Sequence, residues 1–141
     1  LGDFVVAPDG SLSERRPGAR PALRFRWKGL PCAATLSADG LELRAEAGRV
    51  PSTARRDARR ADALEAVRAL PGALPPGWRM FLEADHRVGL GTTSPIAAPA
   101  TAPLLLTALV RFALALEPYR DRLAAAGLEE PAAEPGGTVS T

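Results

Sequence analysis

The sequence is poor in the residues on which most active sites depend. It contains one cysteine, Cys32, and one histidine, His86, among 141 residues. A single cysteine excludes an intramolecular disulfide and the cysteine-based zinc motifs, and a single histidine excludes every multi-histidine metal site. A Ser/His/Asp triad would depend on His86 alone. We therefore predict no catalytic, metal-binding or cofactor-binding residues and expect a protein that is not an enzyme.

Aromatic side chains and excess charge are also scarce. Phe, Trp and Tyr make up 5% of the chain, so the core has to be built mainly from Leu, Val and Ala. The net charge of +2 is too small to predict a nucleic-acid partner, although Lys28 is the only lysine among 18 basic residues and all the others are arginine. Arginine in this proportion is more typical of GC-rich coding than of phosphate binding.

Neither an export signal nor a membrane span is predicted. Residues 1–3 lack the charged region and the apolar stretch of a secretory signal peptide. The longest apolar segment, residues 102–116, is interrupted by Thr107 and Arg111 and is shorter than the roughly 20 residues that a spanning helix needs. We expect a cytoplasmic protein with no membrane partner.

The length of 141 residues predicts one domain with two extensions. Residues 1–21 contain a Pro-Asp-Gly turn signal and a charged, proline-punctuated connection, and they are predicted to form an N-terminal extension or a short hairpin. Residues 22–126 form the single α+β domain. Residues 127–141 are rich in Pro, Gly and Glu and are predicted to be a disordered tail.

Alternating apolar and polar residues predict a sheet. A period of two, which is typical of half-buried strands, runs clearly through three segments and more weakly through two others. The predicted strands lie at residues 23–28, 31–37, 41–47, 78–84 and around 88–90. The dipeptide Asp39-Gly40 is a strong hairpin signal, so the first three strands should form an antiparallel meander.

The segment between the third and fourth strands is predicted to be a helix. It extends over residues 57–70, with Ala61, Leu64 and Val67 on one side, and it should end before Pro71.

A longer and much more apolar helix is predicted at the end of the domain. Residues 102–116 form its core, and Thr101 can cap its N-terminus. Pro118 should kink the helix or split off residues 119–126, and Gly127 is placed like a C-terminal residue. With the element order βββ-α-ββ-α, we predict an α+β fold in which a five-stranded antiparallel sheet is packed by this long C-terminal helix.

Two groups of charged residues are interpreted as solvated faces. The run at residues 55–60 carries four arginines near a helix N-terminus, where they oppose the macrodipole, and the run has no interleaved aromatic residue for base stacking. An acidic or phosphate partner is the alternative interpretation of this run. The residues that project to the wet face of the predicted sheet are Arg24, Arg26 and Lys28 of the first strand and Glu42, Arg44 and Glu46 of the third. Such charges discourage edge-to-edge aggregation.

Three further motifs have a structural interpretation. The pair Asp85-His86 falls at a predicted hairpin tip, which favours an exposed turn over a catalytic base. Residues 89–94 lack the Gly-Lys-Ser/Thr ending of a phosphate-binding loop and are taken as a strand end and a loop. Cys32 lies in a strand and is expected to be buried as a small hydrophobic residue.

The long helix has more apolar perimeter than one sheet can cover. Its main arc, predicted to face the sheet, contains Leu105, Leu109, Phe112 and Leu116. A second flank consists of Leu106, Val110 and Ala113. This flank is predicted to be a possible interface, covered either by a second subunit or, within the monomer, by the helix at 57–70 or by residues 4–6.

The order of elements and several local patterns resemble a known superfamily. Residues 39–43 and 48–51 resemble its first hairpin, third strand and following proline, residues 82–90 its second hairpin, and residues 104–123 its closing helix. Over residues 22–126 the chain thus resembles the type III secretion chaperones and the related YbjN-type regulators. This resemblance implies a non-enzymatic, often dimeric, protein-binding module in the cytoplasm.

Two functions follow from these observations. The leading prediction is a chaperone-like or regulatory module that binds proteins through apolar surface as a homodimer, with no cofactor. The alternative is a domain that binds a small apolar ligand in a cavity between the sheet and the long helix, lined by Trp27, Trp78 and Phe112. A deep cavity there would favour the ligand-binding domain, whereas a filled core with an exposed apolar surface would favour the protein-binding module.

Overall fold

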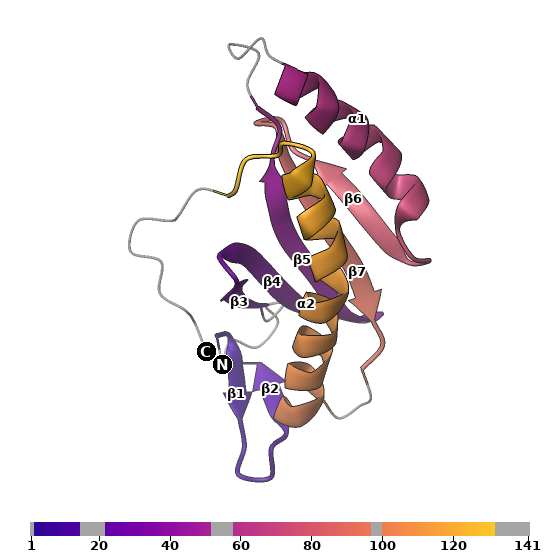
Figure 1. Ribbon diagram of the computed structural model, residues 1–141. Coiled ribbons are helices and arrows are strands. Elements are labelled where there is room, and N and C mark those ends of the chain that lie inside the picture. Colours follow the sequence, from indigo (N-terminus) through magenta and orange to yellow (C-terminus); the bar gives the residue numbers. More distant parts are fainter. Residues whose placement is uncertain (1, 15–21, 52–57, 97–99, 132–141) are drawn as a thin grey trace.

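The computed structural model describes residues 2–14, 22–51, 58–96 and 100–131. Its elements, in chain order, are β1 (Phe4–Val6), β2 (Leu12–Glu14), β3 (Ala22–Trp27), β4 (Leu30–Ser37), β5 (Gly40–Arg49), α1 (Ala58–Ala73), β6 (Trp78–Leu82), β7 (Arg87–Ser94) and α2 (Ala102–Ala125). The predicted α+β class and the order βββ-α-ββ-α are confirmed for the main domain, and the β1–β2 hairpin precedes it (Figure 1).

The main sheet has five antiparallel strands in the order β3-β4-β5-β7-β6, as predicted. Strands β3, β4 and β5 form the expected meander, and Gly40 lies at the predicted turn between β4 and β5 with a φ of 132°. Strand β7 pairs with β5, so the α1 connection carries the chain from β5 to β6 at the far edge. Strands β3 and β6 are therefore the two edges of the sheet.

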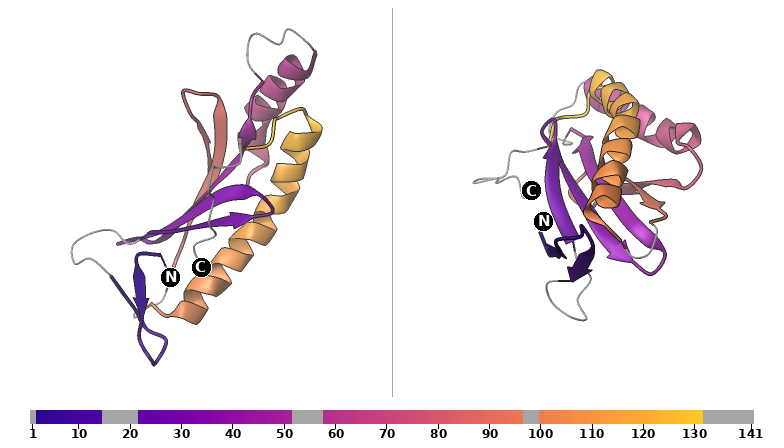
Figure 2. Two further views of the ribbon diagram at one scale, coloured as in Figure 1. Left: turned by 90° about the vertical axis from the view of Figure 1, so that its left-hand side faces the viewer. Right: turned by 90° about the horizontal axis from the view of Figure 1, so that it is seen from below.

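Both described helices pack on one face of this sheet. Helix α2 runs diagonally across β5, and α1 lies beside α2 and next to β6 (Figures 1 and 2). The core between them and the sheet is built mainly from Leu, Val and Ala, as the low aromatic content predicts. Among its fully buried side chains are Leu43, Leu90, Leu105 and Leu116. Successive residues along each strand point to opposite faces, so the other face of the sheet carries the polar side chains.

The N-terminus of α2 is capped and joined to the β1–β2 hairpin. The Thr101 hydroxyl accepts a hydrogen bond from the Leu104 amide at 3.4 Å, which confirms the predicted cap. The Ala102 amide donates to the Gly10 carbonyl at 2.7 Å, and the Leu12 amide donates to the Ala100 carbonyl at 2.8 Å. Backbone hydrogen bonds thus fix the hairpin to the start of α2.

The C-terminus of α2 ends in a Schellman motif. The Leu128 amide donates to the Leu123 carbonyl and the Gly127 amide to the Ala124 carbonyl, both at 3.1 Å, and Gly127 has a φ of 104°. The predicted role of Gly127 is confirmed. Leu128 and Leu123 are both buried, and they occupy the two positions whose apolar contact commonly accompanies this motif.

The chain stays packed beyond the predicted domain boundary at residue 126. Arg49 and Glu129 exchange two backbone hydrogen bonds of 2.9 Å, so residues 127–131 extend along the end of β5 rather than starting a disordered tail. A Cβ at Gly48 would lie 3.0 Å from the Glu129 carbonyl oxygen, so a side chain there would press on this segment. The remainder of the predicted tail, residues 132–141, lies outside the described residues.

The predicted end of the first helix before Pro71 is wrong, and of the two effects predicted for Pro118, a kink or a split, the split does not occur. Pro118 lies inside a continuous α2 and splits off no segment, and Pro71 lies inside α1, which extends to Ala73. Pro118 removes only the hydrogen bond to the Leu114 carbonyl, and Leu114 is on the exposed side of α2, where water can replace that donor. Packing of α2 on the sheet therefore outweighs the local effect of the proline.

The buried side of α1 also differs in part from the prediction. Val67 is buried as expected, and its buried companions are Ala63 and Leu70. Ala61 is exposed and Leu64 is partly buried. The apolar face is thus rotated, because α1 packs against both α2 and β6 rather than against the sheet alone.

Lys28 was expected on the wet face of the sheet with Arg24 and Arg26, but it points to α2. It occupies the β3–β4 turn with a φ of 49°, and its ammonium forms an ion pair with Glu117. Arg120 Nη2 donates to the Lys28 carbonyl oxygen at 3.5 Å. The hydrogen bond from Lys28 lowers the pKa of Glu117 below its ordinary value of 4.5.

The Lys28–Glu117 pair predicts a pH-dependent contribution to stability. A lowered folded-state pKa stabilises the fold above the unfolded value of 4.5, and the contribution is lost as the pH falls through the folded-state value. We expect Glu117→Gln to lower Tm at about pH 7, and we expect the Tm difference from the wild type to be smaller at about pH 3. Thermal melts at both pH values, with Glu65→Gln on exposed α1 as the control, measure this. An equal Tm difference at both pH values would contradict the prediction.

Candidate binding surfaces

Helix α2 has one arc on the sheet and one facing outward. The four residues predicted to cover the sheet, Leu105, Leu109, Phe112 and Leu116, are all buried. Thr107 and Arg111, which interrupt the apolar sequence, are exposed. The helix is therefore oriented on the sheet as its sequence predicts.

Three apolar side chains form a line along the outward arc. Leu106, Val110 and Leu114 follow one another at intervals of four residues, and their exposed fractions are 48%, 49% and 56%. We call these three residues the apolar row. The predicted interface residues Leu106 and Val110 belong to it, but Ala113 is 1% exposed and faces the core. Ala113 follows Leu109 by one helical turn and so shares its buried side, and Leu114 takes its place in the row.

The segments expected to cover this flank within the monomer lie elsewhere. Phe4 of β1 is buried in the core, while its neighbours Val5 and Val6 remain exposed. Helix α1 contacts α2 through its own buried residues, on the side of the sheet core. Within the described part of the chain the apolar row is left about half accessible to solvent.

The observed length of α2 changes the argument from the sequence that no segment is long enough to span a membrane. At 24 residues, Ala102–Ala125, it is long and apolar enough to cross a membrane by length and composition alone, whereas residues 102–116 were too short. Core helices of soluble proteins pass the same test, and 28% of the most apolar window is buried in the fold. This finding is weak evidence for a membrane span.

Aromatic rings occupy the space where an apolar cavity was the alternative prediction. Trp78 stacks on Phe112 with ring centroids 5.3 Å apart and an interplanar angle of 17°. Tyr119 lies against the same indole at 6.0 Å. Trp27, the third expected lining residue, packs against the core. The rings that would have lined a cavity contact one another or the core instead.

The opposite face of the sheet has a hollow with charged walls. Its volume is about 390 Å³. The charged residues that line it are Arg24 and Arg26 of β3, Arg44 and Glu46 of β5, and Glu83 and Arg87 of the β6–β7 hairpin. Small residues, among them Ala33 and Gly89, form its floor. Four guanidinium groups and two carboxylates thus surround one depression.

The strand registers place three arginines on one line across this open face. Arg24 of β3 is paired with Ala33, Ala33 with Arg44, Arg44 with Gly91, and Gly91 with Arg79. The line therefore alternates an arginine with a small residue from edge to edge. We call Arg24, Arg44 and Arg79 the arginine row.

Phe81 supports two members of the arginine row. The Arg44 guanidinium lies 4.0 Å from the centroid of the Phe81 ring, and that of Arg79 lies 5.6 Å from it. The ring itself covers Gly91, where a Cβ would lie 3.0 Å from Phe81 Cε2. The glycines of residues 89–94, expected at a strand end, belong to a continuous β7 and make room for this ring.

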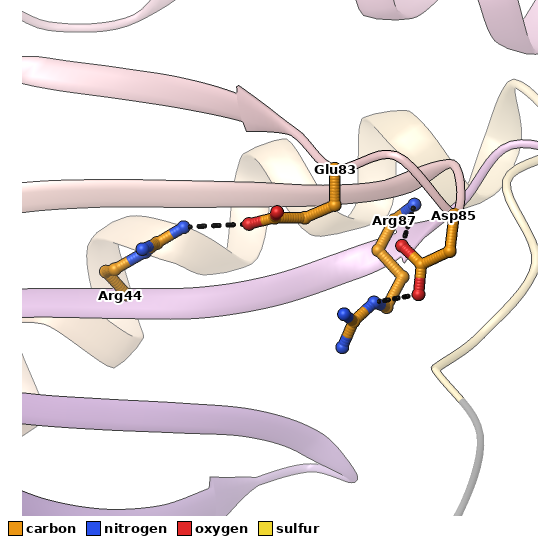
Figure 3. Close-up of polar contacts among 4 residues, drawn as sticks. All are labelled: Arg44, Glu83, Asp85 and Arg87. Carbon is orange, nitrogen blue, oxygen red and sulfur yellow. Dashed lines mark hydrogen bonds and ion pairs between the residues drawn. The ribbon is translucent and has the colours of Figure 1, made fainter.

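Two ion pairs lie at the end of the hollow, near the β6–β7 turn (Figure 3). Arg44 Nη2 lies 3.2 Å from Glu83 Oε1, and Arg87 Nε lies 2.6 Å from Asp85 Oδ2. The hydrogen bond from Arg87 lowers the pKa of Asp85, and the same bond raises the pKa of Arg87. Both arginines are therefore held in place by ion pairs with carboxylates.

The remaining sequence motifs lie where no chemistry is evident. His86 is at the exposed turn between β6 and β7 with a φ of 67°, as predicted for a hairpin tip. Cys32 is buried, and burial raises the pKa of its thiol to about 12, which keeps it protonated. No group of three metal-ligating residues occurs within the described ranges. Residues 55–57 of the charged run lie outside them, and residues 58–60 form the start of α1.

Comparisons with family models, with curated proteins and with solved structures gave no match. The resemblance to type III secretion chaperones and YbjN-type regulators stays a prediction. The two surfaces are therefore interpreted from their own geometry.

Proposed function

We propose that this protein is a non-enzymatic, chaperone-like or regulatory protein-binding module that associates as a homodimer through the apolar row of α2. The observation that carries the proposal is the row itself, Leu106, Val110 and Leu114, half exposed on a helix whose other side is buried. Aligned apolar side chains of this kind mark interaction sites. The protonated, buried Cys32 and the exposed His86 support a role without turnover.

The spacing of the apolar row favours a second copy of this protein as its binding partner. Leu106 and Leu114 lie four residues on either side of Val110, so the row is symmetric about that residue. A twofold axis at Val110 would place each Val110 against its counterpart and Leu106 against the partner's Leu114. Ridges of residues four apart pack into one another at a crossing angle of about −50°.

The size of the row predicts a weak dimer. Full burial of a Val or Leu side chain contributes about 1.5–3 kcal/mol, and about half of that remains to be gained at each exposed position. Six such side chains in a pair would contribute about 4–9 kcal/mol, against an association cost of about 4–15 kcal/mol. The most favourable difference is about 5 kcal/mol, so we expect a reversible dimer whose dissociation constant is about 0.2 mM or weaker.

Val110→Glu should abolish this association. Sedimentation velocity of the wild type from about 10 µM to about 1 mM should show a mass that rises from 14.8 kDa toward twice that value. In Val110→Glu two carboxylates would meet at the twofold axis, so the protein should stay at 14.8 kDa throughout.

Leu104→Glu is the matched control for this experiment. Leu104 is an exposed residue of the same helix outside the apolar row, and its replacement adds the same charge. Its dissociation constant should equal that of the wild type. A wild type that stays monomeric at every concentration, or equal effects of both variants, would refute the homodimer. Binding of the monomer to lipid vesicles would instead assign the row to a membrane surface.

A further inference from the structure

The arginine row differs from an ordinary charged sheet face in what lies between its members. Opposite charges commonly face each other across neighbouring strands. Here the residues paired with Arg24, Arg44 and Arg79 along the row are Ala33 and Gly91. Ala33 leaves the surface between Arg24 and Arg44 open, and the Phe81 ring covers Gly91 between Arg44 and Arg79. A ligand can therefore lie across the strands at this level over an alanine and an aromatic ring.

The row sets a regular spacing. Adjacent strands are about 4.8 Å apart, and one strand separates each arginine from the next, so neighbouring arginines are about 10 Å apart along the row. A peptide in the polyproline II conformation has three residues per turn and rises about 3.1 Å per residue, so its side chains three residues apart lie on the same side and are about 9 Å apart. Acidic residues at every third position of a peptide would match the three arginines.

Two of the three arginines are also positioned in advance. Arg44 is held against Phe81 and by Glu83, and Arg79 lies near the same ring. Ordering side chains before binding reduces the entropy lost when a ligand arrives. A guanidinium additionally offers a planar fork that fits a carboxylate with two hydrogen bonds.

The carboxylates on this face favour a ligand with separated negative charges over a continuous polyanion such as nucleic acid. Glu46 and Glu83 line the hollow beside the row. A nucleic-acid backbone would bring phosphates close to both carboxylates, whereas a peptide with neutral residues between its acidic ones can place these neutral residues there. The hollow of about 390 Å³ gives room for such intervening side chains.

We propose that the open face of the sheet is a binding site for an acidic peptide segment of a partner protein, in which Arg24, Arg44 and Arg79 receive carboxylates spaced three residues apart. This site lies on the sheet face opposite α2, so it is separate from the apolar row. A bound segment crosses the strands from β3 to β6.

Fluorescence anisotropy with a labelled peptide tests the site. The probe is the heptapeptide Glu-Gly-Ser-Glu-Gly-Ser-Glu, and the comparison peptide has the same composition with its three glutamates adjacent. The spaced peptide should bind more tightly at about 50 mM salt and weaken at about 300 mM, because exposed ion pairs are screened. The double variant Arg24→Gln/Arg79→Gln should weaken its binding about fivefold to tenfold.

The matched control removes the same charge elsewhere. Arg68→Gln/Arg111→Gln changes two exposed arginines on α1 and α2 and should bind the peptide as the wild type does. Arg24→Gln alone, at the edge strand, provides a single change that should itself weaken binding, and thermal melts of each variant establish that it is folded. Val110→Glu should retain full peptide affinity, so loss of the dimer and loss of this site are distinguishable.

Three outcomes would overturn the proposal. One is equal affinity for the spaced and the adjacent glutamates. Another is an equal loss of binding in the two double variants, which would reduce the effect to net charge. The third is tighter binding of a single-stranded oligonucleotide of the same charge than of the spaced peptide, which would assign the row to nucleic acid.

Discussion

Phe112→Ala is expected to lower the free energy of unfolding by about 3–5 kcal/mol. Phe112 is 3% exposed, belongs to the core under α2, and stacks on Trp78 of β6. Its loss would leave a cavity between helix and sheet and would remove the aromatic contact that joins α2 to the sheet edge. Because a domain of this size has about 5–15 kcal/mol of stability, the variant should be close to unfolding.

Urea denaturation followed by tryptophan fluorescence measures this effect, with Leu114→Ala as the control. Leu114 lies two residues further along the same helix and is 56% exposed, so its replacement should change stability by no more than about 0.5 kcal/mol. The comparison has to be made at low micromolar concentration, where the proposed dimer is dissociated. Equal losses in the two variants would mean that α2 does not pack on the sheet through Phe112.

Gly40→Ala is expected to destabilise the fold by about 2–4 kcal/mol. Gly40 has a φ of 132°, which an L-residue with a side chain rarely adopts. A Cβ there would lie 2.5 Å from the Ser94 carbonyl oxygen, at the point where β7 pairs with the start of β5. The hairpin and the central strand pairing would both have to shift.

Gly72→Ala separates this effect from a general consequence of replacing glycine. Gly72 lies in the last turn of α1, and a Cβ there would meet nothing within 4 Å. Alanine should therefore raise the free energy of unfolding, by up to about 1 kcal/mol, through its better helix propensity. Thermal or urea melts of both variants measure the difference. A Gly40→Ala protein as stable as the wild type would refute the strain at the turn.

The strands and the orientation of α2 were predictable because each depends on a short-range period. Leu41 and Leu43 alternate with Glu42 and Arg44, and the alternation alone places the first two on the buried face. The same reasoning for a helical period identified Leu105 and Phe112 as buried. Buried positions of this kind follow from local hydrophobicity, because any layer that packs on a strand or helix covers its apolar side.

The ends of the helices and the exact limits of the exposed flank were not predictable in this way. Ala113 and Leu114 are adjacent apolar residues, and a rotation of α2 by less than a third of a turn decides which of them is exposed. Pro118 is compatible with a continuous helix because packing on both sides of it stabilises the same α2. Contacts with the sheet decide both the rotation of α2 and its continuation past Pro118. These contacts cannot be predicted from the local sequence.

The sequence by itself determined the class of fold, the order of its elements, and the poverty of catalytic groups, because these depend on composition and on periods of two and 3.6 residues. The tertiary structure alone decided that Arg24, Arg44 and Arg79 share one line and that Trp78 meets Phe112. These residues are far apart in the chain. Their proximity depends on strand order and on register, and a shift of one residue in register would turn each arginine to the other face.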